Sequence, residues 1–364
     1  MMSSTFYSVS NPFRDLEQLE TIERFLKEND PFVHAAFSLD TSKYQLRDYL
    51  QYSHNPGPPI YAVLDRNIIS RVVKVGSGGS LDVENNTDRL TMAVMAFLCA
   101  ANIEVEPNIA LYEVTATQEN NNVRSELAAV RIANELHPTT YAEIAFGESK
   151  HASRFELRKA RKKIKYMSLN SAKFERFLPH WEMHHLALTK IAVLARQNKN
   201  PEECLRELFR WSLEDAFFDG IAVSLGVVLL GSKGGRSLVM RAVRSSDPDK
   251  RIAVVANATW DLTYASYWVK RTKQFNGPCL FVTADKRLRA LCRLAIGNHS
   301  HQELFRDYWP APHAKELLRA YNDVEAIARD MPRRRDYYST DAWKQKMHEM
   351  QRELTKQLRD IVSD

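Results

Sequence analysis

Short apolar runs that end on a carboxylate constrain the fold of this chain more than any other feature of its sequence. YAVL, residues 61–64, predicts a buried strand, and Asp65 follows it directly. RIAVVAN, 251–257, and GPCLFVTAD, 277–285, are similar runs, and the pattern between them is helical. A strand–helix–strand order predicts a right-handed crossover between parallel strands. Because the carboxyl ends of such strands form the ligand crevice, we expect acids placed there to converge.

Four carboxylates lie where a predicted strand meets a predicted helix: Asp65, Glu113, Asp261 and Asp285. Gathered carboxylates repel one another and stay ionised only if positive charge joins them. Mg²⁺ and Mn²⁺ prefer such oxygen ligands, whereas the absence of histidine from all four stretches disfavours zinc. A bound ion lowers the pKa of water and makes a nucleophile, and a second ion stabilises a leaving oxygen. The pattern therefore predicts a metal site for phosphodiester chemistry.

The segments around these acids resemble the acidic motifs of PIN-domain nucleases: LDRN (64–67), YEV (112–114), WDLTYASYW (260–268) and VTADKRL (282–288). The resemblance implies that the four acids are both the catalytic residues and the metal ligands. It also implies supporting roles for Asn67 and Thr283, which would orient ligands or bound water. The implied fold is α/β, a parallel-sheet PIN-like (Rossmannoid) core. The segment between Glu113 and Asp261 exceeds what a compact PIN domain needs, which implies a mostly helical insertion.

The helical and strand patterns divide the chain into five expected regions. These are an N-terminal helical region 1–58, a first part of the core 59–119, a helical insertion 120–246, a second part of the core 247–310 and a C-terminal helical region 311–364. The tail after Thr340 has one apolar stripe at helical spacing, and Thr340 or Asp341 can cap it. Such a stripe favours a helix docked on its own chain over a coiled-coil dimer.

The segment RFELRKARKKIK, 154–165, concentrates positive charge beyond the formal net charge of +6, and Glu156 is its one acid. At helical spacing its cations form a face that suits a row of phosphates, although a solvated helix face stays an open alternative. Lys286, beside the expected site, either steers a phosphate or caps exposed backbone. The expected nucleic-acid-binding residues are Arg158, Arg161, Lys162, Lys165 and Lys286.

The function that these features favour is a metal-dependent endonuclease, preferably an endoribonuclease, because most members of the resembling family cut RNA rather than DNA. By analogy with small members of that family, a toxin or an antiviral defence effector is the expected setting. The alternative is a non-catalytic PIN-like module that binds nucleic acid or protein. A third reading is a helical interaction protein whose acidic matches are coincidence. A protein partner or inhibitor and a homo-oligomer both stay open.

Composition favours a globular protein of the cytoplasm, with 44% hydrophobic and 26% charged residues. No apolar run approaches the roughly 18 residues of a membrane span, so no membrane partner is expected. The first residues, MMSSTFYSVSNPF, lack the pattern of a signal peptide. The four cysteines are scattered without metal-binding spacing, which predicts reduced thiols.

Structural explanations compete with several of these assignments. Asp65 and Asp261 each suit the start of a helix for capping alone. The motif HWEMHH, 180–185, lacks the HExxH order of a metal site, and the glycine-rich GSGGS, 76–80, and GSKGG, 231–235, match no phosphate loop. The other acids that stay open as candidates or supporting residues are Asp40, Glu104, Glu106, Glu126, Glu214, Asp215 and Asp219.

Overall fold

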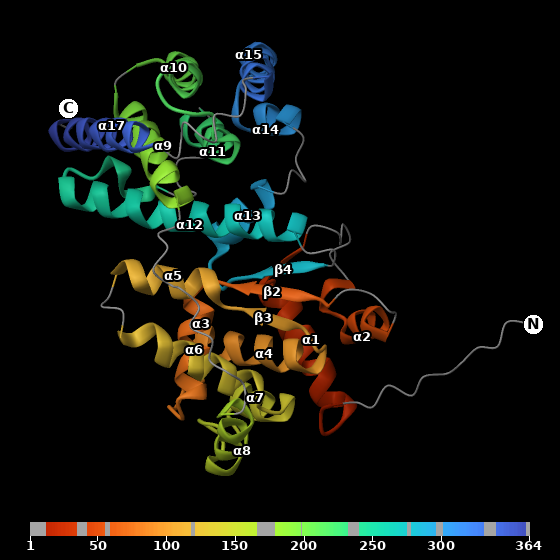
Figure 1. The fold of residues 1–364 in the computed structure, drawn as a ribbon. Helices are drawn as coiled ribbons and strands as arrows, with labels where there is room; N and C mark the ends of the chain where they lie inside the picture. The colour runs from red at the N-terminus through yellow and green to blue at the C-terminus, as the bar shows by residue number, and fades with distance from the viewer. Residues whose placement is uncertain are drawn as a thin grey trace, which may run out of the picture. The chain divides into compact units, whose positions relative to one another are not determined.

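The computed structural model describes residues 12–34, 42–54, 59–117, 121–165, 179–197, 199–231, 240–274, 278–295, 301–330 and 340–361. These residues form two compact units, whose elements are labelled in Figure 1. Unit 1 contains the described residues of Met1–Phe177 and Tyr267–Arg289, and unit 2 contains those of Leu178–Ser266 and Ala290–Asp364. Each unit therefore combines segments that lie far apart in the sequence.

One four-stranded sheet, in the order β1–β4–β2–β3, forms the centre of unit 1. β2 (Tyr61–Leu64) lies between β3 (Glu104–Glu106) and β4 (Cys279–Val282) and runs parallel to both. β1 (Phe32–His34) pairs with β4 in the antiparallel sense. Every residue of β4 is buried, as is the rest of β2 after its first residue. Because β2 and β4 are parallel neighbours, their carboxyl ends meet at the same edge of the sheet.

Helices make up most of unit 1. α4 is almost wholly buried and packs against α7, while α3 packs against α6. In Figure 1, α7 lies beyond α4 as seen from the sheet, and α8 lies farther out. The helices are α1 (Leu16–Asn29), α2 (Leu46–His54), α3 (Arg66–Gly76), α4 (Asn86–Ala100), α5 (Asn108–Thr117), α6 (Asn121–Asn134), α7 (Pro138–Ala145), α8 (Arg154–Lys165) and the start of α13 (Lys286–Ala295), with a short 3₁₀ turn at Ser42–Tyr44.

The described part of unit 2 is helical. α9 packs against α11 and α17, and α10 packs against α11 and α15. The buried guanidinium of Arg251 donates hydrogen bonds to the carbonyl oxygens of Leu358 and Arg359 (3.0 and 2.7 Å), which joins α12 to the end of α17. The helices are α9 (Pro179–Arg196), α10 (Pro201–Glu214), α11 (Gly220–Leu230), α12 (Pro248–Gln274, of which the residues up to Ser266 belong here), α14 (His301–Tyr308), α15 (Ala311–Asp330) and α17 (Asp341–Asp360), with a 3₁₀ turn at Arg241–Arg244.

The expected fold class, an α/β protein with a parallel-sheet PIN-like core, is wrong. The described chain is mostly helical, and its single small sheet is mixed because β1 is antiparallel. The run 251–257 is the clearest error, since it lies inside α12 rather than in a strand. Its burial follows a helical period, with Arg251, Val255 and Ala258 buried and Ala253 and Asn257 exposed. A short apolar run occurs both in strands and in buried helix segments, so it does not distinguish the two. Here the run belongs to the long helix α12.

The C-terminal stripe behaves as expected. Thr340 caps α17 by accepting a hydrogen bond from the backbone N–H of Trp343 (3.2 Å). Trp343, Met347, Leu354 and Leu358 are buried, and α17 packs against α9, so the tail is docked on its own chain. None of the helices described combines the length and the apolar character that crossing a membrane requires. The stretch 120–246 contributes residues to both units, and the five predicted region boundaries stay predictions.

Candidate active site

Asp65 joins β2 to α3 and is buried, with 1% of its surface exposed. Its backbone is extended (φ −69°, ψ 168°), so α3 begins after it, and its Oδ1 accepts a hydrogen bond from the N–H of Ile68 (2.8 Å). Its own N–H donates to the carbonyl oxygen of Val282 in β4 (3.1 Å). The carboxylate therefore caps α3, which is the structural role expected of an aspartate at a helix start. The backbone of Asp65 extends the hydrogen bonding between β2 and β4 by one residue.

Thr283 and Asp285 follow β4 at the same edge and complete the surroundings of Asp65. The hydroxyl of Thr283 donates to Oδ2 of Asp65 and accepts a hydrogen bond from the N–H of Asp285 (2.9 Å). Oδ1 of Asp285 accepts hydrogen bonds from the N–H groups of Arg287 (2.6 Å) and Leu288 (3.4 Å), so Asp285 caps α13. Asp285 is exposed, whereas Thr283 is fully buried. One buried hydroxyl thus links the two aspartates.

Glu113, in α5, is the third acid that the structure brings into this group. The pKa of Asp65 is raised to about 6, mainly by burial. The negative charges of Asp285 and Glu113 also raise this pKa, whereas the hydrogen bonds from Thr283 and Ile68 lower it. Glu113 is half-buried. Asp285 and Glu113, which come from two other segments of unit 1, therefore both lie within electrostatic range of Asp65.

The donor chemistry of this group suits a hard cation, because all three side chains offer carboxylate oxygens. Across the described residues, no three histidine, cysteine or acidic side chains lie close enough to hold a metal ion together. Mg²⁺, however, keeps several waters and is usually bound by one or two carboxylates. Each oxygen of Asp65 has a second lone pair beyond the one used by Ile68 or Thr283. The assignment of Asp65, Glu113 and Asp285 as ligands of Mg²⁺ or Mn²⁺ stays a prediction.

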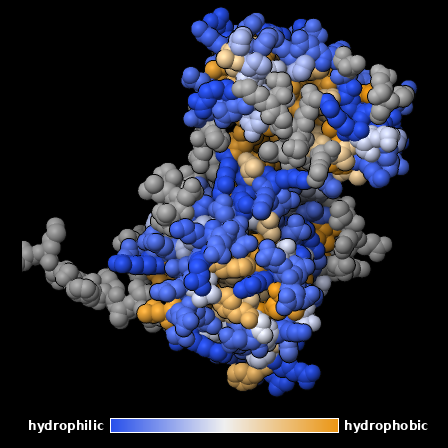
Figure 2. Space-filling view, turned by 180° about the vertical axis from the view of Figure 1, so that it is seen from behind, coloured by the Kyte–Doolittle hydropathy of each residue, from blue (hydrophilic) through white to orange (hydrophobic). Residues whose placement is uncertain are grey.

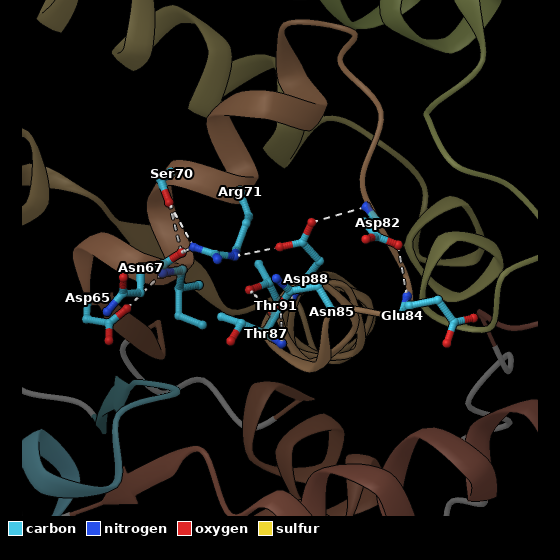
Figure 3. Close-up of polar contacts among 11 residues, drawn as sticks. Asp65, Asn67, Ser70, Arg71, Asp82, Glu84, Asn85, Thr87, Asp88 and Thr91 are labelled. Carbon is cyan, nitrogen blue, oxygen red and sulfur yellow. Dashed lines mark hydrogen bonds and ion pairs between the residues drawn. The ribbon is translucent and has the colours of Figure 1, made fainter.

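Asn67 is exposed, and its side-chain amide makes no hydrogen bond to any residue that the structure describes. Its carbonyl oxygen accepts hydrogen bonds from Nη1 of Arg71 (2.8 Å) and Oγ of Ser70 (3.0 Å). Nε of Arg71 also pairs with Oδ1 of Asp88 at the start of α4 (2.8 Å). Figure 3 shows this chain of contacts from the start of α3 to α4. The supporting role predicted for Asn67 stays a prediction.

Asp261 lies in the middle of α12, with helix on both sides, rather than in the first turn of a helix after a strand. The prediction about its local structure is wrong, for the same reason that 251–257 was mistaken for a strand. Asp261 is half-buried and belongs to unit 2, whereas Asp65, Glu113 and Asp285 belong to unit 1. Its assignment as a metal ligand stays a prediction.

Two rival acids in unit 1 already have partners. The guanidinium of Arg66, next to Asp65 in the sequence, holds both carboxylate oxygens of Glu126 (2.6 and 2.9 Å). Glu106 accepts a hydrogen bond from the hydroxyl of Tyr267 (2.9 Å). Sequence reasoning missed the Arg66–Glu126 pair, although an arginine directly after the candidate aspartate was a visible signal. Glu104, Glu214 and Asp215 are exposed, and Asp40 lies outside the described residues.

The HWEMHH motif forms no metal centre with the side chains described. Nδ1 of His184 instead pairs with Oδ2 of Asp219 (2.5 Å), another acid that had stayed open. The rings of His180 and His184 stack, as do those of Trp181 and His185 (centroids 6.3 and 4.7 Å apart). His184 is buried, so it belongs to the packing of unit 2.

The predicted basic helix is α8. Arg158, Arg161 and Lys162 are exposed on it; Lys165 is its last residue, but its side chain is not among those described. Lys286 is exposed in the first turn of α13, directly after Asp285. In GSGGS, Gly76 ends α3 and Gly78 adopts a positive φ, so this loop is a turn. In GSKGG, all but Gly231 lies outside the described residues.

No protein-family model, curated protein or solved structure matches this chain. Any function must therefore be argued from the chemistry of its own residues.

Proposed function

We propose that unit 1 is a metal-dependent endonuclease that hydrolyses phosphodiester bonds beside Asp65, with RNA as the favoured substrate. One observation carries the proposal. The buried carboxylate of Asp65 and the exposed Asp285 meet at the carboxyl edge of parallel strands, where the hydroxyl of Thr283 hydrogen-bonds to both residues. Burial and the charges of Asp285 and Glu113 raise the pKa of Asp65. Groups with strongly shifted pKa values gather at functional sites. Three of the four segments that resemble the acidic motifs of PIN-domain nucleases, those of Asp65, Glu113 and Asp285, belong to unit 1.

The unfavourable charge of this group is the reason for proposing a cation. Ionising Asp65 in a buried place beside Asp285 and Glu113 is costly, and a divalent ion at the two aspartates would remove most of that cost. Mg²⁺ or Mn²⁺ there would supply a nucleophile by lowering the pKa of water and would neutralise charge on the phosphate. Hydrolysis would leave a phosphate on one fragment and a hydroxyl on the other.

The chain's own residues would position these parts. Thr283 restrains both aspartates, because its hydroxyl donates to Asp65 and accepts from the N–H of Asp285. Glu113 adds the negative charge that strengthens attraction for a cation. Lys286, exposed beside Asp285, would attract a phosphate of the substrate.

A non-catalytic module that binds nucleic acid is the second candidate. Asp65 and Asp285 both cap helices, which gives each of them a structural role without any metal. In that case the raised pKa of Asp65 would result mainly from burial. The hydrogen bonds from Ile68 and Thr283 would then partly offset the free-energy cost of burying the carboxylate.

Cleavage of an end-labelled single-stranded RNA in Mg²⁺, Mn²⁺ or EDTA separates the two candidates. Asp65→Asn and Asp285→Asn should each lower the cleavage rate by roughly 100-fold or more, because even residues that only support a metal ligand are worth roughly 10- to 100-fold. Asp15→Asn is the matched control, since Asp15 caps α1 in the same way but lies outside the acidic group. Equal cleavage by all three variants, or cleavage unaffected by EDTA, would remove these acids and the metal from the activity. No cleavage by the wild-type chain in Mg²⁺ or Mn²⁺ would leave the binding module as the answer.

The biological setting belongs to the same proposal. None of the four cysteines forms a disulfide, as a reducing compartment favours, and we propose that the activity belongs to the cytoplasm. A nuclease toxin or antiviral effector should arrest growth when expressed, and Asp65→Asn should relieve the arrest. The same test with Asp261→Asn decides whether this acid of unit 2 contributes to the activity. Relief of the growth arrest would support its assignment as a metal ligand, and full growth arrest would contradict that assignment.

A further inference from the structure

One face of helix α8 is buried against the rest of unit 1. Leu157, Ala160 and Ile164 are buried, and α8 packs against α6. Its single acid, Glu156, is held by hydrogen bonds from the hydroxyls of Thr140 (2.5 Å) and Ser153 (2.8 Å). Glu156 is therefore directed toward other partners and does not neutralise the cations of the helix.

The opposite face has an exposed aromatic ring among cations. Phe155 is 76% exposed, more than any other large apolar residue in the described part of the chain. Arg158, Lys159 and Lys162 follow it at three, four and seven positions, which places all four on one side of the helix. These three cations are exposed, and none of them forms a hydrogen bond or ion pair with a described residue. In Figure 2, hydrophilic side chains border a small apolar area at the lower end of unit 1, where α8 lies.

This combination has a specific chemical use. Cations attract phosphates whatever the nucleic acid, whereas the face of an aromatic ring can stack only on a base that is not already paired and stacked. Folding gives no reason for exposing a phenylalanine, because leaving such a ring in water costs about 1.5–3 kcal/mol relative to burying it. The apolar ring and the unpaired cations together are complementary to a single strand.

We propose that Phe155 and the cations Arg158, Lys159 and Lys162 form a docking platform for single-stranded RNA, on which an unpaired base stacks against Phe155. The proposal deepens the nuclease function and rests on it for the choice of RNA and for the path to the acids. The platform selects single strands over duplexes, because a duplex offers phosphates but no free base.

The position of α8 within unit 1 fits a strand that continues to the acids. The side chain of Leu157 lies beside the turn that follows α3, where a Cβ on Gly78 would be 3.3 Å from Leu157 Cδ1. Asp65 caps the other end of α3. α3 has 11 residues, so about 16 Å of helix at 1.5 Å per residue separates the two places. α8 and Asp65 therefore both adjoin α3 within unit 1.

A membrane surface is the competing partner for a basic helix with an exposed ring. A membrane-binding helix needs a broad apolar face, and the apolar residues Leu157, Ala160 and Ile164 of α8 are already buried in unit 1. Phe155 alone is left, and the exposed residues around it are charged. A single strand fits this surface better.

Binding measured in EDTA tests the platform independently of cleavage. Fluorescence anisotropy of the full chain with a labelled single-stranded RNA should show roughly 5- to 100-fold weaker binding for Phe155→Ala, the range of one base–aromatic stack. Phe155→Tyr should keep the wild-type affinity. Leu16→Ala is the matched control, since Leu16 is 67% exposed in unit 1 but lies on α1. Thermal melts should show that all variants stay folded.

Two further measurements settle the class of partner. A blunt RNA duplex of the same sequence should lose less than about twofold in affinity with Phe155→Ala, whereas Arg158→Ala should weaken both RNAs and lower the salt slope by about one. Unchanged single-strand binding by Phe155→Ala, or an equal loss on the duplex, would overturn the platform. Tighter binding to phosphatidylserine vesicles than to the single strand, lost in Phe155→Ala, would replace it with a membrane site. A chain that binds in this way but never cleaves RNA would keep the platform and lose the nuclease.

Discussion

The hydroxyl of Thr283 donates a hydrogen bond to Oδ2 of Asp65, although 218 positions separate the two residues in the sequence. This contact joins the end of β4 to the end of β2, and the same hydroxyl accepts the N–H of Asp285. The buried edge of the sheet therefore holds a polar network whose members each have a partner.

Asp65 should make the metal-free protein less stable as the pH rises. Its pKa is about 6 in the folded chain and near 3.8 when unfolded, so the folded state binds the extra proton between these values. The free energy of unfolding then falls as the pH rises through this window. Asp65→Asn should remove this fall, which amounts to about 3 kcal/mol at about 1.4 kcal/mol per pH unit. Urea unfolding in EDTA from pH 4 to 8 measures it, and parallel curves for the two proteins would contradict the shift.

Thr283→Ala should raise the pKa of Asp65 further, because the hydroxyl that stabilises the ionised carboxylate is lost. At pH 7 in EDTA the free energy of unfolding should fall by about 1.5–3 kcal/mol, the usual contribution of a hydrogen bond to a charged group. Thr283→Ser keeps the hydroxyl and should restore both properties. Carbon NMR of the Asp65 carboxyl group gives the pKa directly. Identical titration in the alanine and serine variants would show that the hydroxyl has no such effect.

Divalent cations should stabilise the wild-type chain. At a concentration ten times the dissociation constant, Mg²⁺ or Mn²⁺ adds about 1.4 kcal/mol to the free energy of unfolding, which raises the melting temperature by a few degrees. Asp65→Asn and Asp285→Asn should abolish the increase, while Asp15→Asn, a cap elsewhere, should keep it. Differential scanning fluorimetry with a cation titration measures the shift. An equal increase in all four proteins would place the cation elsewhere.

Gly76→Ala should destabilise the packing of α3 on α6. A Cβ at this position would lie 2.0 Å from the carbonyl oxygen of Ala129, so the backbone has to move. Overpacking of this kind costs about 1–3 kcal/mol. Ser77→Ala, at the exposed neighbouring position, should change the free energy of unfolding by less than about 0.5 kcal/mol. Chemical unfolding of the two variants compares them, and similar stabilities would show that the two helices adjust freely.

Asp219→Ala should destabilise unit 2, because Asp219 both caps α11 through the N–H of Ala222 (3.2 Å) and pairs with His184. Together these contacts are worth about 2–4 kcal/mol. Although burial raises the pKa of Asp219, His184 and the cap hydrogen bond lower it below its usual range. The stabilisation is therefore present above about pH 4 and should disappear as the pH falls further. Asp219→Asn, which keeps the cap, should cost less; an equal cost at pH 3 and pH 7 would contradict the ion pair.

Local features of the fold were predictable from the sequence where one segment carries the whole signal. The apolar stripe and the cap at Thr340 predicted α17, and YAVL predicted β2. In each case the spacing of the apolar residues matches the periodicity of the element that buries them. The run 251–257 was not predictable in this way. Its apolar residues suit a strand or a helix. The run is helical because α12 continues on both sides of it.

The sequence by itself determined two helix starts: Asp65 and Asp285 both cap helices, since an aspartate side chain can accept the N–H groups that the first turn leaves without partners. Tertiary structure decided which ends meet. The parallel pairing of β2 with β4 brings Thr283 to Asp65, and α5 brings the charge of Glu113 to the same place. Asp261 was assigned by motif alone, and its helix places it in unit 2. Pairing between strands depends on contacts across more than 200 residues, and no local pattern encodes them.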